Sequence, residues 1–438
     1  MHNIHVAIPC LDEEEALPSC LDALARHTRP ADMIWVCVNQ PDSWWERPDR
    51  MDICQANHRT LETLRKRADL PLTILDRSSP GKGWPRGKAG VGHARAHLFA
   101  AVASQEGAQD QDLFVSLDAD TIVAPGYLQA VEEAFQRHPG AVGLAAPYHH
   151  RLPAEPALRR AILRYEIYLR SYFLNMAATA SPQLFTALGS AIALPLGAGR
   201  KVSGPPARPA GEDFYLLQKL AKIGPLALWT HVAVQPSARP SRRVPFGTGP
   251  AVAQGMEGRW DAYPIFDPSI FDEVADALDM LGELHHHDLD HPLFQFLQTG
   301  SNKPLWPSLR RNHPDPRRFV RACHERIDGL RILQYVRWRT SQSGRRDAKN
   351  LVETLHRRAG DMLDAIDPRQ VAPITEALSA LDDPASLDLR SLEIIRDILA
   401  RKEDSLRQER TIHWQTHLAF YGMGGHGPSG GRAAMSRT

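Results

Sequence analysis

The chain has 438 residues, of which 43% are hydrophobic and 24% charged, and these values are typical of a folded globular protein with two or three domains. Its 52 lysines and arginines nearly balance its 51 aspartates and glutamates, which excludes a global charge bias toward nucleic acid or acidic membranes. The five cysteines form no CxxC pair and are odd in number, so the sequence favours a reducing compartment over a disulfide framework or a zinc site.

The opening run "MHNIHVAIPC" enters a strand pattern without the charged and long apolar regions of a signal peptide. No later stretch approaches the roughly 18 apolar residues that a membrane span needs. We therefore expect a cytoplasmic protein, and peripheral contact with the inner face of the membrane stays open.

Strand-like and helix-like segments alternate over the first 150 residues. The strand-like runs are "HVAIPC", "MIWVCVN", "LTILDR", "LFVSLD" and "AVGLAAP", and segments with apolar residues at helical spacing separate them. This alternation predicts an α/β fold, a mostly parallel sheet with helices on both faces. Ligands bind such sheets at the carboxyl ends of the strands.

Beyond residue 150 the pattern changes gradually. A longer helix is expected over 157–180, strands at "LFTALGSAIAL" and "LALWTHVAV", and a helix at "FYLLQKLAKIG" between them. From about 265 to 421 the signal is helical, which predicts an α/β domain over 1–255 and an α-helical C-terminal domain over 265–421. The tail, 422–438, is too rich in glycine and polar residues to pack, and we expect it to be disordered.

The fourth strand-like run ends in two carboxylates, within "VSLDADTIV". Asp118 and Asp120 are two apart, and in extended backbone such residues point the same way. Two like charges at an apolar strand end need a positive partner. Both carboxylates can reach one divalent cation, and hard oxygen ligands suit Mg²⁺ or Mn²⁺. The pattern alone favours two solvated acids at a strand end, because DxD is common, so its context must decide.

Two enzyme classes share this pattern. One is the nucleotide-sugar glycosyltransferases, whose metal-binding motif is DxD. The other is the haloacid-dehalogenase-type phosphatases, in which Asp118 would be the nucleophile, Asp120 the acid and Thr121 the last motif residue. The phosphatase motif normally opens its domain, whereas three strand–helix units precede it here.

Two further segments resemble family 2 glycosyltransferases of the GT-A fold. In "VAIPCLDEEEALPSCLDAL" a strand runs into a P-x-x-N-E-E-like turn; Glu13 and Glu14 agree with the family, and Asp12 stands in place of its usual Asn. Later, "GEDFYLLQKLAKIG" is similar to the family's E-D motif followed by an apolar helix. The order of the three motifs also fits the family over residues 5–250.

The resemblance implies a metal-dependent enzyme that moves a sugar from a nucleotide-diphosphate sugar to an acceptor hydroxyl, with inversion. Such a reaction needs a cation to neutralise the departing diphosphate and a carboxylate to accept the hydroxyl proton. The family pattern places the metal, Mn²⁺ or Mg²⁺, at Asp118 and Asp120, and the general base at Asp213. Glu212 is expected to orient the acceptor. A helix cap is an alternative role for Asp213.

The resemblance also implies a donor pocket over the ends of the first strands and beside the DxD motif. Its expected members are Pro9, Leu11, Glu13, Asn39, Asp118 and Ala119. The family usually has two acids after its second strand, and this chain has Asn39 and Gln40. An amide can both donate and accept, so the nucleobase stays open, and so does a nucleotide-sugar-binding protein without turnover.

Three further predictions concern basic residues and a histidine. In "GKAGVGHARAHL" glycines allow close approach of backbone to phosphate, and Lys88 and Arg95 are expected to contact the donor. After the last strand, Arg242 and Arg243, with Arg239, are expected to close over the diphosphate, or else form a solvated turn. His231 is a candidate third metal ligand, or else a core residue. The "HHHDLDH" run, 285–291, reads better as a polar loop than as a metal site.

Overall fold

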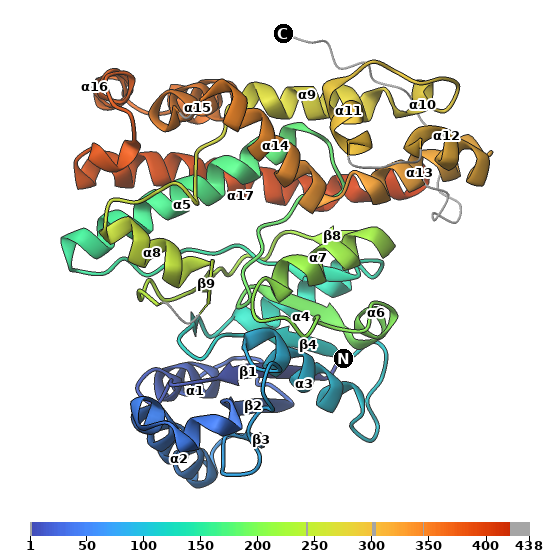
Figure 1. Ribbon diagram of the computed structural model, residues 1–438. Helices are drawn as coiled ribbons and strands as arrows, with labels where there is room; N and C mark the ends of the chain where they lie inside the picture. The colour runs from blue at the N-terminus through green and yellow to red at the C-terminus, as the bar shows by residue number, and fades with distance from the viewer. Residues whose placement is uncertain (1, 242–243, 300–303, 345, 421–438) are drawn as a thin grey trace.

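A computed structural model describes residues 2–241, 244–299, 304–344 and 346–420, without the side chains of 411–420. The molecule has a lower part built on a sheet and an upper layer of helices (Figure 1). The expected tail, 422–438, lies outside the described residues.

The central sheet has seven strands in the order β3-β2-β1-β4-β7-β6-β8. The pairs β1–β2, β2–β3, β1–β4 and β6–β8 are parallel, and only β7 runs antiparallel to its neighbours, so the predicted mostly parallel sheet is confirmed. The strands are β1 (Ile4–Cys10), β2 (Met33–Asn39), β3 (Leu72–Arg77), β4 (Leu113–Ser116), β6 (Gly143–Ala145), β7 (Ile192–Pro195) and β8 (Leu226–Ala227).

Two predicted strands are shorter than expected. Only Ile192–Pro195 of "LFTALGSAIAL" forms a strand, and "LALWTHVAV" divides into β8 and β9. The strand β9 (Val234–Gln235) leaves the main sheet and pairs with β5 (Ile122–Val123) just after the DxD motif. This second, two-stranded sheet holds the chain that follows Asp120 against the chain that leads to Arg239.

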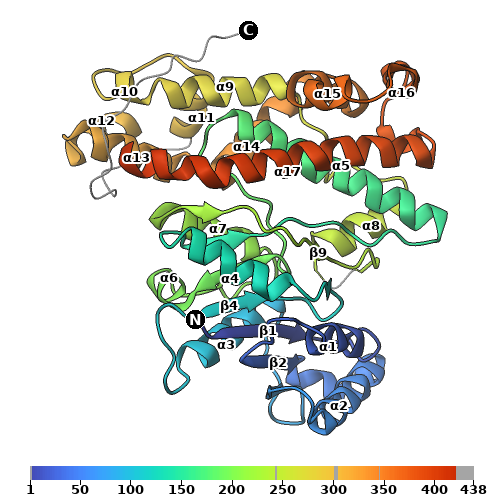
Figure 2. The ribbon, with the colours of Figure 1, turned by 180° about the vertical axis from the view of Figure 1, so that it is seen from behind.

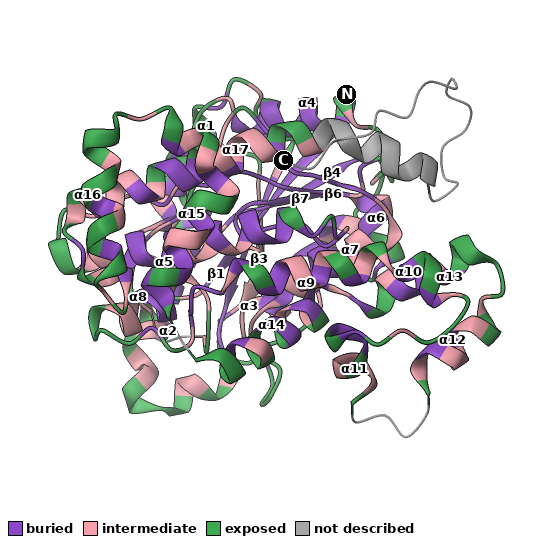
Figure 3. Cartoon of the chain, turned by 90° about the horizontal axis from the view of Figure 1, so that it is seen from above, coloured by how far each residue is buried: buried purple, intermediate pink, exposed green. Residues whose placement is uncertain are grey.

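Helices flank the sheet. Those of the lower part are α1 (Leu17–Ala25), α2 (Met51–Lys66), α3 (Val91–Ala103), α4 (Tyr127–Arg137), α6 (Leu196–Lys201) and α7 (Glu212–Ile223), with 3-10 turns η1 (Asp42–Glu46) and η2 (Pro48–Arg50). Figure 3 shows strands β1, β4, β6 and β7 buried, beneath helices whose outer faces are exposed. Strand residues such as Ile8, Val36 and Val115 are fully buried, as a sheet covered on both faces requires.

The upper layer contains helices from both halves of the sequence. They are α5 (Pro156–Ala178), α8 (Thr248–Met256), α9 (Pro268–Asp279), α10 (Leu281–Leu284), α11 (Pro292–Gln298), α12 (Leu305–Asn312), α13 (Pro316–Arg326), α14 (Gly329–Ser343), α15 (Asp347–Asp364), α16 (Pro368–Ser379) and α17 (Leu389–Phe420), with the turn η3 (Pro384–Ser386). Helices α5 and α17 lie side by side in both views (Figures 1 and 2). The expected helical character after 265 is therefore present, and α5 packs with it although it precedes residue 255.

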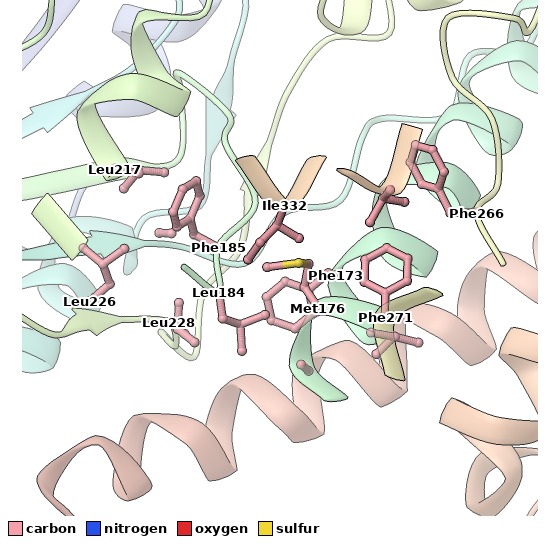
Figure 4. Packing of buried hydrophobic residues seen from close by; sticks show 14 of the residues in the cluster. Phe173, Met176, Leu184, Phe185, Leu217, Leu226, Leu228, Phe266, Phe271 and Ile332 are labelled. Carbon is pink, nitrogen blue, oxygen red and sulfur yellow. The ribbon is translucent and has the colours of Figure 1, made fainter. Parts of the chain in front are cut away.

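One apolar core runs from the sheet into the helical layer. Figure 4 shows Phe173 and Met176 of α5 among Leu226 of β8, Phe271 of α9 and Ile332 of α14. All five side chains are buried. The same core contains residues from both sides of the predicted domain boundary at 255–265. It therefore does not divide the chain there, and the boundary stays a prediction.

A buried ionic network ties α17 to α5 and to the sheet. Glu403 accepts from Arg170 at 2.8 Å and from Arg407 at 2.8 Å, and all three residues are at most 1% exposed. Arg407 also donates to the carbonyl of Ala145, in β6, at 2.8 Å, and to that of Leu228 at 3.2 Å.

Within the described residues, no helix has the length and hydropathy to cross a membrane.

Candidate active site

Polar side chains from distant parts of the sequence gather where β1 and β4 end. These strands are parallel neighbours, so the turn after Cys10 and the turn after Ser116 emerge at the same edge of the sheet. In the first turn Asp12 has a left-handed φ of 57° and donates its N–H to Asn57 at 2.9 Å. In the second, the amide of Thr121 donates to the carbonyl of Asp118 at 3.0 Å. The edge therefore presents Glu13, Asp118 and Asp120 together.

Arg95 of α3 is the centre of the site. The residue is 5% exposed; Nη2 donates to Oδ1 of Asp118, Nη1 to Oε1 of Glu212, and Nε to the Ser116 hydroxyl at 3.1 Å. The positive partner of Asp118 is thus an arginine of the protein. Arg95 joins the DxD motif to the E-D motif, whose Glu212 stands 117 positions after Arg95 in the chain.

A glycine makes room for this arginine. A Cβ placed at Gly189 would lie 2.1 Å from Nη2 of Arg95 and 2.4 Å from its central carbon. In the loop before β7, the backbone of Gly189 therefore packs directly against the guanidinium. Gly189 was not among the predicted site residues, because nothing local in "LFTALGSAIAL" indicates which side chain its backbone meets.

Glu212 and Asp213 begin α7 and differ in exposure. Gly211, just before them, adopts a left-handed φ of 75° that lets the chain turn into the helix. Glu212 is 2% exposed and paired to Arg95, whereas Asp213 is half-buried and accepts a hydrogen bond from the amide of Phe214 at 2.7 Å. Asp213 is therefore the carboxylate of this pair that an incoming molecule can meet.

Both carboxyl groups are held away from their ordinary titration range. Burial raises the pKa of Glu212 to about 7; Arg95 opposes this rise and the charge of Asp213 adds to it. Burial also raises the pKa of Asp213, again opposed by Arg95, and Asp118 raises it further. The two acids are buried next to each other, and the single charge of Arg95 only partly offsets the cost of ionising both. Their pKa values therefore lie closer to neutrality than those of ordinary carboxylates.

A second guanidinium lies on the other side of the aspartates. Nη2 of Arg239 donates to both oxygens of Glu13, at 2.6 and 2.8 Å, and lies 3.7 Å from Oδ2 of Asp120. Arg151 donates to the carbonyl of Asp120 at 3.1 Å. Arg239 thus links the turn after β1 with the turn after β4. The predicted partners Arg242 and Arg243 lie outside the described residues.

His231 does not join this cluster. Its side chain is half-exposed, and Nδ1 lies 3.8 Å from a carboxylate oxygen of Glu133 in α4. In the part of the chain that the structure describes, no three or more His, Cys, Asp and Glu residues are grouped to hold a metal ion. Of the three predicted metal ligands, Asp118 and Asp120 therefore lie in one turn, whereas His231 lies apart from them against α4.

The amides after β2 face the interior. Asn39 is 3% exposed; its Nδ2 donates to the carbonyls of Cys10 at 2.9 Å and Cys37 at 3.3 Å, and its Oδ1 accepts from Trp84 at 3.0 Å. Gln40 is fully buried, and its Oε1 accepts from Asn57 at 2.8 Å. The two amides thus serve packing between β1, β2 and the loop that carries Trp84.

The remaining predicted donor residues surround this edge at different depths. Pro9 is buried within β1, Leu11 is half-buried in the turn after it, and Ala119 is buried between the two aspartates. Lys88 is exposed in the loop before α3, and its amide donates to the carbonyl of Pro85 at 3.0 Å. In the histidine-rich run, the ring of His291 caps α11 by accepting from the amide of Leu293 at 3.1 Å.

Among known proteins, only solved structures were found to be similar to this chain. No family model and no curated protein sequence matches the chain. S. aureus TarS, residues 1–349, solved with UDP-GlcNAc, is 13% identical with a TM-score of 0.39, over 93% of this chain and 92% of that one. The mannosyltransferase PcManGT from Pyrobaculum calidifontis, solved with GDP-Man and Mn²⁺, is 16% identical with a TM-score of 0.31, over 90% and 86%.

A third likeness is to glucosyl-3-phosphoglycerate synthase from Mycobacterium tuberculosis, solved with Mn²⁺, UDP-glucose and phosphoglyceric acid. It is 16% identical with a TM-score of 0.36, over 59% of this chain and 79% of that one. At these identities and TM-scores the likenesses carry no argument about chemistry.

Proposed function

We propose that this chain is a glycosyltransferase that moves a sugar from a nucleotide-diphosphate sugar to an acceptor hydroxyl. The observation that carries the proposal is the pairing of one buried guanidinium, Arg95, with both Asp118 and Glu212. It joins a pair of strand-end carboxylates suited to a diphosphate and its cation with a helix-start carboxylate suited to proton transfer. Sugar transfer needs both functions side by side.

The donor would lie over the ends of β1 and β4. Asp118 and Asp120 are both partly exposed at one turn, and two such carboxylates are ligands of the kind that Mg²⁺ and Mn²⁺ bind. They would hold the cation, which when bound supplies positive charge to the departing diphosphate. Leu11, Glu13, Ala119 and Lys88 border the same edge and complete the proposed donor contacts. Asn39 is left out of this set because its amide is used in the interior.

Asp213 would accept the proton of the attacking hydroxyl. It is the more exposed member of its pair, and its raised pKa makes it a stronger base than an ordinary aspartate. A direct attack opposite the leaving diphosphate inverts the anomeric carbon. Glu212 is buried on Arg95, so it acts as a positioning residue that holds the guanidinium between the two acid motifs.

The experiment is a thermal-shift panel of UDP, GDP, CDP and dTDP sugars, each with and without Mn²⁺. A ligand at a hundredfold excess over its Kd stabilises the folded state by about 2.7 kcal/mol. Asp120→Asn should remove the metal-dependent part of the shift. Asp69→Asn is the matched control, because Asp69 is an exposed carboxylate paired with Arg67 before β3, and it should leave the shift intact.

Three outcomes would contradict the proposal. The first is that no donor produces a shift, and the second is that the shift survives fully in Asp120→Asn. The third is release of phosphate from p-nitrophenyl phosphate through an aspartyl-phosphate at Asp118, which is the mark of the phosphatase alternative. Donor binding with neither transfer nor hydrolysis across a broad acceptor set would instead indicate a binding protein.

A further inference from the structure

An exposed aromatic ring stands beside the proposed base. Among the described residues, Phe246 is the most exposed of the large hydrophobic side chains, at 50%. Its ring lies on Gly211: a Cβ at that glycine would be 3.0 Å from Cε2 and Cζ of the ring. Gly211 directly precedes Glu212 and Asp213, so the ring borders the site where the acceptor hydroxyl would be deprotonated.

A second aromatic ring meets the same glycine. The same Cβ position at Gly211 lies 4.0 Å from Cε2 of Tyr215, one turn into α7. Tyr215 is partly exposed, and the guanidinium of Arg208 covers its ring at 4.0 Å from the centroid. Phe246 and Tyr215 therefore flank the start of α7 and form an aromatic rim around Gly211.

A residue of the helical layer makes a hydrogen bond to the loop that carries Phe246. The carbonyl of Gly247 accepts a hydrogen bond from the hydroxyl of Tyr263 at 3.4 Å. Tyr263 packs edge-on against Tyr165 and Tyr168 of α5, with ring centroids 5.3 and 5.6 Å apart. The loop of the exposed ring is thus linked through Gly247 to an aromatic cluster of the helical layer.

We propose that the acceptor is a carbohydrate whose pyranose ring lies against Phe246 and presents a hydroxyl to Asp213; this inference rests on the proposed function. A pyranose combines an apolar face of C–H groups with a rim of hydroxyls. The negative face of an aromatic ring attracts the C–H groups, and the carboxylate accepts from a hydroxyl. The half-buried carboxylate of Asp213 near the ring favours a neutral ligand that carries hydroxyl groups.

The test uses saturation-transfer NMR with methyl pyranosides as probes, in the presence of whichever nucleoside diphosphate the protein binds. Glycerol serves as the probe that has hydroxyls and no ring. Wild type is compared with Phe246→Ala and Phe246→Trp, and Trp338→Ala is the control, because Trp338 is also exposed, at 39%, but lies on α14. We expect at least one pyranoside to bind, Phe246→Ala to weaken it about three- to tenfold, and Phe246→Trp to restore it.

The inference is overturned if Phe246→Ala binds the pyranosides as well as wild type does. It is also overturned if wild type binds no pyranoside, or binds glycerol equally well. Nucleotide affinity, measured on the same samples by calorimetry, separates this failure from the larger one. Retained nucleotide binding with no pyranoside effect rejects only the carbohydrate acceptor, whereas absent nucleotide binding rejects the glycosyltransferase itself.

Discussion

Arg95 and Gly189 meet without a side chain between them: a Cβ at Gly189 would lie 2.1 Å from Nη2 of Arg95. The guanidinium is therefore bounded by backbone on one side and by the carboxylates of Asp118 and Glu212 on others. A charge confined in this way is oriented before any substrate arrives, and such preorganisation is how proteins stabilise charge that develops during a reaction.

Replacing Arg95 should be costly to folding as well as to activity. Arg95→Met leaves Glu212 buried without its cation, and breaking a buried pair in this way typically costs about 3–5 kcal/mol. Urea unfolding followed by fluorescence measures the loss. The control is Arg47→Met, whose exposed pair with Asp49 should contribute little. Equal stabilities of the two variants would show that the Arg95 pairs are not made in solution.

Activity should rise with pH through neutrality. The base must be ionised to accept a proton, and Glu212, coupled to it, has its pKa raised to about 7. Below that pH the pair holds a proton and turnover falls; above it turnover reaches a plateau. Initial rates of transfer or donor hydrolysis between pH 5 and 9 measure this limb, and a flat profile would contradict it.

Removing the proposed base should separate binding from chemistry. Asp213→Asn keeps the shape and the oxygen that accepts from the amide of Phe214, but it cannot accept the hydroxyl proton. We expect unchanged nucleotide affinity by calorimetry and a loss of transfer of at least about a hundredfold, the lower range for general-base catalysis. Turnover equal to that of wild type would remove Asp213 from the mechanism.

Placing an acid at Asn39 should destabilise this chain. In Asn39→Asp the side chain can no longer donate to the carbonyls of Cys10 and Cys37, which lie in the buried sheet. A buried acceptor without its donor costs about 1–3 kcal/mol. Asn312→Asp, at an exposed amide, is the control for the charge itself. Equal urea midpoints for the two variants would contradict this account of Asn39.

Glu403 should be essential for attaching α17. Glu403→Gln weakens its bonds to both Arg170 and Arg407, which are at most 1% exposed, and leaves two buried cations with one carboxylate fewer. We expect a loss of about 3–5 kcal/mol in unfolding free energy. Glu393→Gln, on the same helix, removes a half-exposed pair with Arg159 and should cost less than about 1 kcal/mol. A smaller effect at Glu403 than at Glu393 would argue against the network.

The sheet was predictable because its signal is local. Alternating strand and helix periods over the first 150 residues predicted β1, β2, β3 and β4 at nearly their observed bounds. The antiparallel insertion of β7 between β4 and β6 was not foreseen, since strand order depends on which edges pair and not on the period of any one strand. The position of α5 among the C-terminal helices was missed for the same reason.

The candidate site was predictable in part. Strand-end placement indicated Asp118 and Asp120 from the sequence, and like-charge repulsion indicated that a cation must be near. The identity of that cation was not indicated: Arg95 read as a donor contact, and the structure pairs it with two carboxylates of the protein. Asn39 read as a base-binding amide, and packing against Trp84 turned it inward.

By itself the sequence determined the α/β alternation, the acids that follow the fourth strand and the acidic start of α7, because each depends on neighbours a few positions away. Only the tertiary structure decided which charges meet. Arg95 with Glu212, and Arg239 with Glu13, are joined across 117 and 226 positions. Contacts at that range follow from how the elements pack, and a guanidinium carries no local mark of the carboxylate that will neutralise it.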